Sequence, residues 1–218
     1  LKLAAALLFG ITAMPVIDEP LAATLLDATL AETIALHARM REHGAAEVAR
    51  AADAIVASLA HGGKLLVFGN GGSAADAQHM AAELVSRFQR NRQALAALAL
   101  TTDTSILTSI GNDMGFDQIF ERQVEALARP GDVVLGISTS GQSPNVIKGL
   151  EAAHRVGAFT IAMTGRDGGD VGRLADVHLN APTASTARAQ ELHCTLLHVI
   201  CDLVERAATT AAAPAVAA

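Results

Sequence analysis

Aromatic residues are scarce in this chain, which has no Trp, no Tyr and only six Phe among 218 residues. Proteins that bind single-stranded nucleic acid stack the bases on aromatic side chains, and this chain offers few. Acidic residues outnumber basic residues by 22 to 16, which gives a formal net charge of −6. Proteins that bind the phosphate backbone of nucleic acids usually carry an excess of basic residues, and this chain does not. Nucleic acid is therefore not an expected partner, and the core must be aliphatic.

Cysteine is scarcer still. Cys194 and Cys201 are the only two, and they lie seven positions apart within one apparent helix, where a disulfide is geometrically unfavourable. No disulfide framework can be built from this pair. A reducing cytoplasm is therefore the simplest compartment.

The two ends of the chain differ in composition from the rest. The opening "LKLAAALLFGITAMPVIDEP" resembles a signal peptide, but its apolar stretch is shorter than the roughly 20 residues of a membrane-spanning helix. We interpret residues 1–25 as an apolar extension and expect translation from Met14, which would leave residues 1–13 outside the working protein. Residues 208–218 form a low-complexity tail. Residues 26–207 suit one cytoplasmic domain with no membrane partner.

The apolar pattern changes its period along the chain. From about Leu25 to Leu59 it is helical, and Gly44 is expected to divide it into two helices. Five short apolar runs then alternate with helical patterns: "KLLVFG", "ALALT", "DVVLGIS", "AFTIAMTG" and "DVHLNAP". Continuous apolar runs are typical of strands buried on both faces. The pattern predicts an α/β fold of three αβα layers, flavodoxin-like, with a five-stranded, mainly parallel sheet and additional N-terminal helices.

The first run is followed by "GNGGSAADAQHMAAEL". Gly69, Gly71 and Ala74 match the dinucleotide fingerprint, but the window about 20 residues further on, "QRNRQAL", lacks the acidic residue that holds a ribose hydroxyl. A glycine turn remains, whose amides can approach an anion or sugar hydroxyls. Ser73 is predicted to cap the helix that follows.

The third run ends in "STSGQSPNVIKGL", which is rich in hydroxyl groups. Pro144 fits the first position of a helix whose N-cap would be Ser143. Exposed amides and the dipole of a helix N-terminus bind phosphate without any lysine. We therefore predict a phosphate site here; the alternative is an ordinary capped loop. The hydroxyl groups of the predicted site belong to Ser138, Thr139, Ser140 and Ser143.

Polar residues also occur at helical spacing. His79 and Glu83 are four apart and share a helix face, while Gln190 and His198 are eight apart in the last helix, so two helices could present pairs to a common centre. Spacing alone favours ordinary core or surface histidines over metal ligands. Cys194, midway along the second pair, is a further possible ligand, although a small buried hydrophobe is its commoner role. Asn112 and Asp113, by themselves, read as turn residues.

Five ordered motifs resemble those of the sugar isomerase (SIS) domain family: "GNGGSAADAQHMAAEL", "IGNDMGF", "GDVVLGISTSGQSPNVIKG", "TGRDGG" and "RAQELHCTLLH". The resemblance extends from about Leu30 to Glu205. It implies an aldose-ketose isomerase that converts sedoheptulose 7-phosphate to D-glycero-D-manno-heptose 7-phosphate, the first step of ADP- or GDP-heptose precursor synthesis. It also implies a homotetramer.

The resemblance further assigns roles to single residues. One Zn²⁺ per subunit would be held by His79, Glu83, Gln190 and His198, and Glu83 with His198 would be the acid/base pair. Substrate contacts would come from the glycine turn, the serine-rich loop and the helices: Asn70, Gly71, Gly72, Ser73, Glu83, Asn112, Asp113, Ser138, Thr139, Ser140, Ser143 and Gln190.

An isomerase of this kind needs a base near C1 and C2 of the sugar and an acid near the carbonyl oxygen. A carboxylate and an imidazole suit these roles, but the sequence does not say which of Glu83 and His198 takes the carbon-bound proton. The alternative is a non-catalytic member of the family, either a DnaA-binding initiator-associating protein or a sugar-phosphate sensor. Because DnaA-binding members lack residues corresponding to Glu83 and His198, the enzyme is favoured.

Overall fold

The computed structural model describes residues 18–211. Its centre is a five-stranded sheet in the order β2-β1-β3-β4-β5 in which every neighbouring pair is parallel. The predicted α/β class and all five predicted strands are confirmed: β1 (Leu65–Gly69), β2 (Ala97–Ala99), β3 (Val133–Ser138), β4 (Phe159–Gly165) and β5 (Val177–Ala181).

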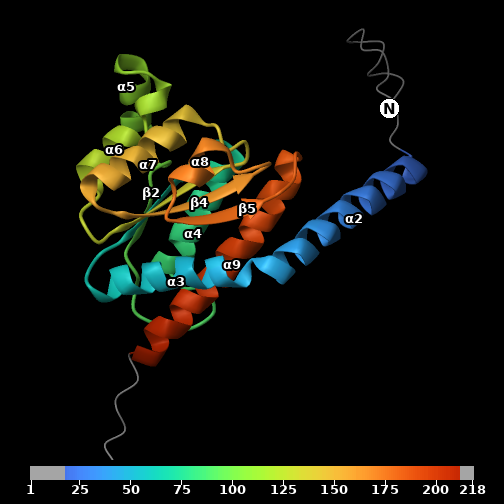
Figure 1. Ribbon diagram of the computed structural model, residues 1–218, viewed down its shortest axis with the longest axis horizontal. Helices are drawn as coiled ribbons and strands as arrows, with labels where there is room; N and C mark the ends of the chain where they lie inside the picture. The colour runs from blue at the N-terminus through green and yellow to red at the C-terminus, as the bar shows by residue number, and fades with distance from the viewer. Residues whose placement is uncertain (1–17, 212–218) are drawn as a thin grey trace, which may run out of the picture.

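Helices cover both faces of this sheet, which gives the three predicted layers (Figure 1). On one face lie α3 (Ala45–Ala60), α4 (Gly72–Val85) and α9 (Thr186–Ala211). On the other lie α6 (Glu121–Leu127), α7 (Pro144–Val156) and α8 (Gly169–Leu174), with α5 (Thr104–Asp113) and the short helix η1 (Phe116–Gln118) beside them.

The sheet separates two hydrophobic cores. Along β1, Leu65 and Val67 belong to the core under α3, α4 and α9, whereas Leu66 and Phe68 belong to the core under α6 and α7. Phe68 stacks on Phe120 with ring centroids 4.7 Å apart. Both faces of the strand are therefore buried, which explains its uninterrupted apolar sequence.

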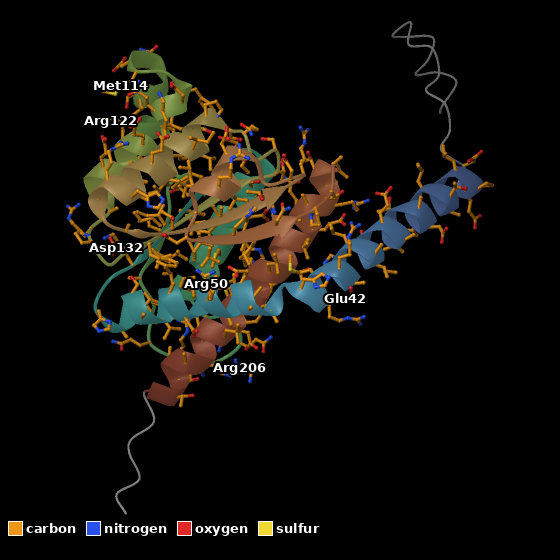
Figure 2. All side chains as sticks on the ribbon, in the orientation of Figure 1. Glu42, Arg50, Met114, Arg122, Asp132 and Arg206 are labelled. Carbon is orange, nitrogen blue, oxygen red and sulfur yellow. The ribbon has the colours of Figure 1, made fainter. Side chains whose placement is uncertain are left out.

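The strand order reverses between β1 and β3. The chain after β1 enters α4 on one face and the chain after β3 enters α7 on the other, so the two loops diverge from neighbouring strand ends. In open parallel sheets, ligands bind in the crevice at such a switch point. The opposite end of the same strands is tied structurally, because Asp132 (labelled in Figure 2) accepts hydrogen bonds from Lys64 N at 2.9 Å and Lys64 Nζ at 2.6 Å.

The N-terminal helical region divides at Gly44, as predicted, into α2 (Glu19–His43) and α3. Helix α2 begins earlier than the expected Leu25, because the Asp18 carboxylate accepts a hydrogen bond from Leu21 N at 3.0 Å and caps it. Helix α9 likewise continues past the expected boundary at residue 207. The prediction about residues 1–13 falls outside the described residues.

Helix α2 is largely exposed, and its N-terminal half projects from the body of the domain (Figure 1). Leu36 alone among the described residues of α2 is buried. By length and composition α2 is the one helix within residues 18–211 that could cross a membrane, and only 6% of the tested window is buried.

Candidate active site

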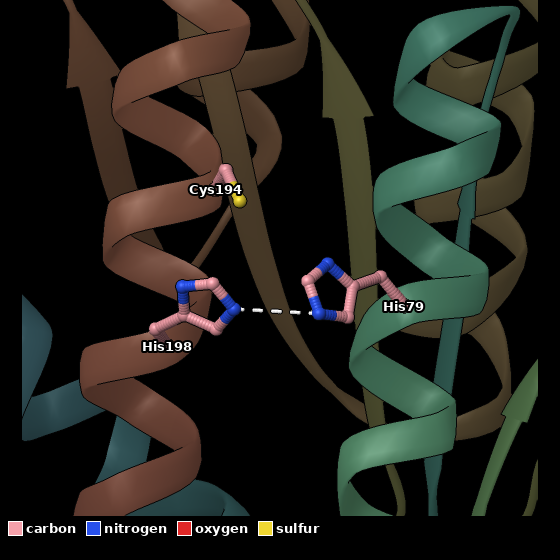
Figure 3. Close-up of side chains that lie close together, drawn as sticks. All are labelled: His79, Cys194 and His198. Carbon is pink, nitrogen blue, oxygen red and sulfur yellow. Dashed lines mark hydrogen bonds between the residues drawn. The ribbon is translucent and has the colours of Figure 1, made fainter. Parts of the chain in front are cut away.

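Helices α4 and α9 lie side by side and run in the same direction, so that residues pair at successive levels. A Cβ added to Gly72 at the start of α4 would lie 2.2 Å from Nε2 of Gln190 near the start of α9. Further along, His79 faces His198 (Figure 3). The two sequence pairs expected to share a centre are therefore brought to one helix interface.

The glycine turn places α4 in this position. Gly71 has φ +56° and ψ −119°, a conformation that L side chains rarely adopt, and it is the N-cap of α4. The prediction that Ser73 caps this helix is wrong: because Gly71 makes the turn, the helix begins at Gly72, and Ser73 is buried within its first turn. A side chain at Gly72 would require the amide end of Gln190 to move.

His79 stands at the centre of the polar cluster between the helices. Its Nε2 lies 3.1 Å from Glu83 Oε1 and 3.3 Å from His198 Nε2. The two imidazole rings meet edge to face, with centroids 4.9 Å apart and an interplanar angle of 80°. His79 therefore contacts Glu83 on its own helix and His198 across the interface between α4 and α9.

These separations suit a metal ion. Two nitrogen or oxygen ligands, each about 2.0–2.1 Å from a tetrahedral ion, lie about 3.3–3.4 Å apart, close to the 3.1 and 3.3 Å found here. His79, Cys194 and His198 also form a group that could hold a metal, with ligand atoms all within 4.8 Å of one another. Cys194 lies one turn before His198 on α9 and faces the same gap (Figure 3).

Burial shifts the pKa values of two groups beside this cluster, Asp76 and Cys194. Burial raises the pKa of Asp76, opposed by nearby His79, and among the described residues Asp76 Oδ2 is buried without a hydrogen-bond partner. Burial, followed by the charge of Asp76, raises the pKa of the Cys194 thiol. Without a metal, Cys194 is therefore held as a neutral thiol, and coordination would have to displace its proton.

The serine-rich loop lies at the carboxyl end of β3. Ser138 Oγ is 2.8 Å from Ser143 Oγ and 3.3 Å from Ser140 Oγ, and Ser140 Oγ accepts a hydrogen bond from Gln142 N at 3.1 Å. Ser143 is the N-cap of α7 and Pro144 its first residue, as predicted. Three hydroxyls and a helix N-terminus therefore gather at the switch point, where they can bind an anion.

A pair of amides joins this loop to the glycine turn. Asn70 Nδ2 donates to Asn145 Oδ1 at 2.9 Å, and Asn145 Nδ2 donates back to Asn70 Oδ1 at 2.8 Å. Next to the pair, a cavity of about 170 Å³ is lined by residues that include Asn70, Gly71 and Phe116. Asn145 was not among the residues predicted from the sequence, although its place just after Pro144 in the first turn of α7 was a usable indication.

Three other predicted site residues, Asn112, Asp113 and Thr139, make no hydrogen bond to the histidine cluster among the described residues. Asn112 and Asp113 are the last residues of α5, exposed, and Asn112 Nδ2 donates to Asp113 Oδ1 at 2.7 Å. The backbone carbonyl of Thr139 faces Gly165, where an added Cβ would lie 2.4 Å from it.

The run "QELHCTLLH" divides into two sets by helix face. Glu191 pairs with Arg188 and accepts a hydrogen bond from Thr33 on α2 at 2.7 Å, so it anchors one helix to another. His193 is fully buried, with Nε2 2.8 Å from the carbonyl of Thr164. The other set, Gln190, Cys194 and His198, faces α4.

The fold and this site define a class of protein. The SIS domain family model matches residues 30–165, and the chain belongs to this family. Its curated relatives include the phosphoheptose isomerase of Aquifex aeolicus, 60% identical over 161 residues that make up 74% of this chain and 84% of the relative. The phosphoheptose isomerase of Trichlorobacter lovleyi is 52% identical over 177 residues, 81% of this chain and 90% of that protein.

Solved structures of phosphoheptose isomerases are also similar to this chain. The phosphoheptose isomerase GmhA of Neisseria gonorrhoeae has a TM-score of 0.81 at 47% identity, covering 85% of this chain and 99% of that one. The phosphoheptose isomerase of Francisella tularensis has a TM-score of 0.82 at 36% identity, covering 85% and 98%. The sugar isomerase domain of an RpiR transcription factor from Sphaerobacter thermophilus, 20% identical with a TM-score of 0.59, shares the fold alone.

Proposed function

We propose that the chain is an aldose-ketose isomerase that converts sedoheptulose 7-phosphate to D-glycero-D-manno-heptose 7-phosphate, the first step of ADP- or GDP-heptose precursor synthesis. The observation that carries the proposal is the cluster of Glu83, His79 and His198 between α4 and α9. Glu83 and His79 lie on the helix that leaves the glycine turn at the switch point of the sheet, and His198 faces them from α9. Phosphoheptose isomerases at 52 to 60% identity support the same assignment.

Glu83 and His198 are the proposed acid/base pair. One of them removes the proton from the hydroxyl-bearing carbon next to the carbonyl, while the other protonates the carbonyl oxygen to give an enediol. Returning a proton to the former carbonyl carbon, with loss of a hydroxyl proton from the neighbouring oxygen, completes the isomerisation. The order of the two groups stays open.

The proposed metal is one Zn²⁺ per subunit, held by His79, Glu83, Gln190 and His198. Bound there, it would polarise the sugar carbonyl or orient its hydroxyls. The ligand separations around His79 support the site. Gln190 lies near the start of α9 against Gly72, and Cys194 lies between it and His198, so the thiol competes with the amide for the fourth position.

Cobalt substitution distinguishes these two ligand sets. Co²⁺ bound by imidazole, carboxylate and amide groups has no intense sulfur-to-metal charge-transfer band in the near ultraviolet, whereas Co²⁺ bound by a thiolate has one. We expect no such band. A band that disappears in Cys194→Ser would place the thiolate in the ligand set, and a spectrum unaffected by His79→Ala would refute the site altogether.

The substrate phosphate is proposed to bind the hydroxyls of Ser138, Thr139, Ser140 and Ser143 at the N-terminus of α7. The sugar would contact Asn70, Gly71, Gly72 and Ser73 of the glycine turn, together with Asn112, Asp113, Glu83 and Gln190. The hydroxyl cluster around Ser138 supports the phosphate assignment. Ser138→Ala with Ser140→Ala should weaken phosphorylated ligands, since each lost hydrogen bond to a charged group costs about 1.5–3 kcal/mol.

We also propose a cytoplasmic homotetramer. Several large apolar side chains of α2 are exposed, and exposed apolar surface of this kind commonly marks an interaction site, which supports an interface between copies: Leu21, Leu25, Leu26, Leu30 and Ile34. Both cysteines are free, which suits a reducing compartment. Light scattering at micromolar concentration that gave the mass of one 22.4 kDa chain would contradict the tetramer.

The decisive test of function is Glu83→Gln, which keeps the shape of the side chain but removes the base. Turnover of sedoheptulose 7-phosphate should fall about 10²- to 10⁴-fold. Glu151→Gln, the same change at an exposed position on α7, is the matched control and should leave turnover unaltered. A wild-type protein that binds the ketose phosphate without consuming it would instead favour the non-catalytic sensor.

A further inference from the structure

We propose that Glu205, acting through the loop of residues 86–93, is a positioning residue that sets the placement of Glu83 against His198. The inference rests on the proposed acid/base roles of these two residues. Glu205 touches neither of them. It acts through the loop that follows α4. Residues of this loop contact the backbone of Glu83 and the imidazole ring of His198.

Glu205 lies on α9 with its side chain completely buried. Its carboxylate accepts three backbone hydrogen bonds from the loop: Phe88 N at 2.9 Å, Gln89 N at 2.8 Å and Arg90 N at 2.8 Å. Three consecutive peptide groups are thereby fixed to α9. A buried carboxylate is costly unless it is fully hydrogen-bonded, so this arrangement tolerates little displacement of the loop.

Arg92 carries the constraint to Glu83. Its side chain is 3% exposed, and its Nε lies 3.3 Å from Glu205 Oε1 as an ion pair, without the alignment of a hydrogen bond. Its Nη2 donates to the carbonyl of Glu83 at 2.8 Å, and its Nη1 donates to the carbonyl of Leu84 at 2.8 Å. These carbonyls belong to the last turn of α4, which lacks helical partners. Arg92 therefore links Glu205 to the backbone of Glu83 itself.

Phe88 carries the constraint to His198. The two rings stack with centroids 5.4 Å apart and an interplanar angle of 24°. The backbone N–H of this same Phe88 is bound by Glu205, which follows His198 by seven residues, about two turns along α9. Phe88 thus covers one face of the His198 imidazole, and the His79 ring meets the same imidazole at an interplanar angle of 80°. The plane of the ring is set by the loop that Glu205 holds.

An ordinary loop anchor would need only one of these connections. Here one buried carboxylate holds a loop that reaches the backbone of Glu83 on α4 and the side chain of His198 on α9. Asp202, one turn before Glu205 on the same helix, offers the contrast. It binds the Arg90 side chain at 2.6 Å and holds no backbone amide of the loop among the described residues.

The test compares Glu205→Gln and Phe88→Leu with the wild type, with Asp202→Asn as the matched control. Misplacement of a catalytic group by about 1 Å can reduce a rate about 10²-fold, so kcat should fall about 10- to 100-fold in both variants. KM should change less than about twofold, because the phosphate loop is untouched. Phe88→Tyr, which keeps the ring, should restore kcat, and Asp202→Asn should keep it.

The double variant Glu205→Gln with Phe88→Leu sharpens the test. If both act through one loop, its kcat should match that of the slower single variant instead of showing the product of the two losses. Full kcat in both single variants, while Glu83→Gln is inactive, would overturn the positioning role and leave the proposed function standing. An active Glu83→Gln would refute the proposed pair itself. If Glu205→Gln does not fold, Phe88→Leu and Phe88→Tyr decide the question.

Discussion

Helices α2 and α9 have nearly the same length, 25 and 26 residues, yet they use their apolar side chains in opposite ways. Helix α9 packs against α3 and α4 and buries Leu192, Leu196, Leu197, Ile200 and Val204. Helix α2 buries Leu36 and exposes leucines such as Leu25 (59%) and Leu26 (60%). The apolar side chains of α9 are thus buried within the subunit, whereas most of those on α2 remain exposed.

The comparison also separates the proposed chemistry from the proposed assembly. The polar groups of the candidate site and of the proposed positioning network on α9, namely Cys194, His198 and Glu205, face α4 or the loop after it. Helix α2 reaches α9 through Thr33, bonded to Glu191, and His37, whose Nε2 lies 2.9 Å from Thr195 Oγ1. Changes on α9 should therefore affect turnover or folding, whereas changes on the exposed half of α2 should affect association.

The largest expected effect comes from His198→Asn on α9. Loss of the proposed general acid or base should lower kcat about 10²- to 10⁴-fold, with the oligomeric state unchanged. His43→Asn makes the same substitution on α2, where the side chain is 83% exposed, and should leave kcat alone. Steady-state kinetics and light scattering on both variants test this prediction. Equal losses of kcat in the two variants would contradict it.

Leucine truncation should separate the two apolar faces. Leu197→Ala on α9 removes a fully buried side chain and should lower the free energy of unfolding by about 2–5 kcal/mol. Leu25→Ala on α2 should cost less than about 0.5 kcal/mol at dilutions where the chain is monomeric. Urea unfolding at several chain concentrations measures both. A concentration-independent loss as large as that of Leu197→Ala would mean that Leu25 packs within its own subunit.

Charge on α2 should act on association alone. Leu26→Asp with Ile34→Asp places two carboxylates among the exposed apolar side chains of α2, and burying unpaired charges in an interface is costly. The mass in solution should fall toward that of one chain. Asp27→Asn with Glu32→Gln, on the same helix, is the control that should keep the wild-type mass. An unchanged mass in the Asp variant would show that the interface does not include this part of α2.

The smallest effect concerns acid stability. Burial raises the pKa of Glu205, but its backbone N–H donors and Arg92 outweigh burial and leave the pKa below its usual range. A lowered folded-state pKa contributes stability above the unfolded value, about 4.3, and this contribution disappears as the pH falls below it. Glu205→Gln should therefore flatten the loss of stability below that pH, measured by thermal melts. Glu32→Gln on α2 should leave the slope as it is.

Much of the fold was readable in short segments. Apolar runs such as "KLLVFG" predicted strands buried on both faces, and Pro144 after Ser143 predicted the start of α7. These features depend on neighbours in the chain, through side-chain alternation and the fixed φ of proline. The error at Ser73 arose in the same local way, since a serine after two glycines reads as a cap until Gly71 is seen to make the turn.

The sequence by itself determined the strands, the loops at their carboxyl ends and the residue types available for acid/base chemistry. Only the tertiary structure decided which of them meet. His198 faces His79 from 119 positions away, while His193 in the same run turns to the carbonyl of Thr164. Glu205 reaches Phe88 across 117 positions, and no local pattern encodes such a contact. Local periodicity limits which face a residue occupies, but the partner on that face is set by how distant helices pack on the sheet.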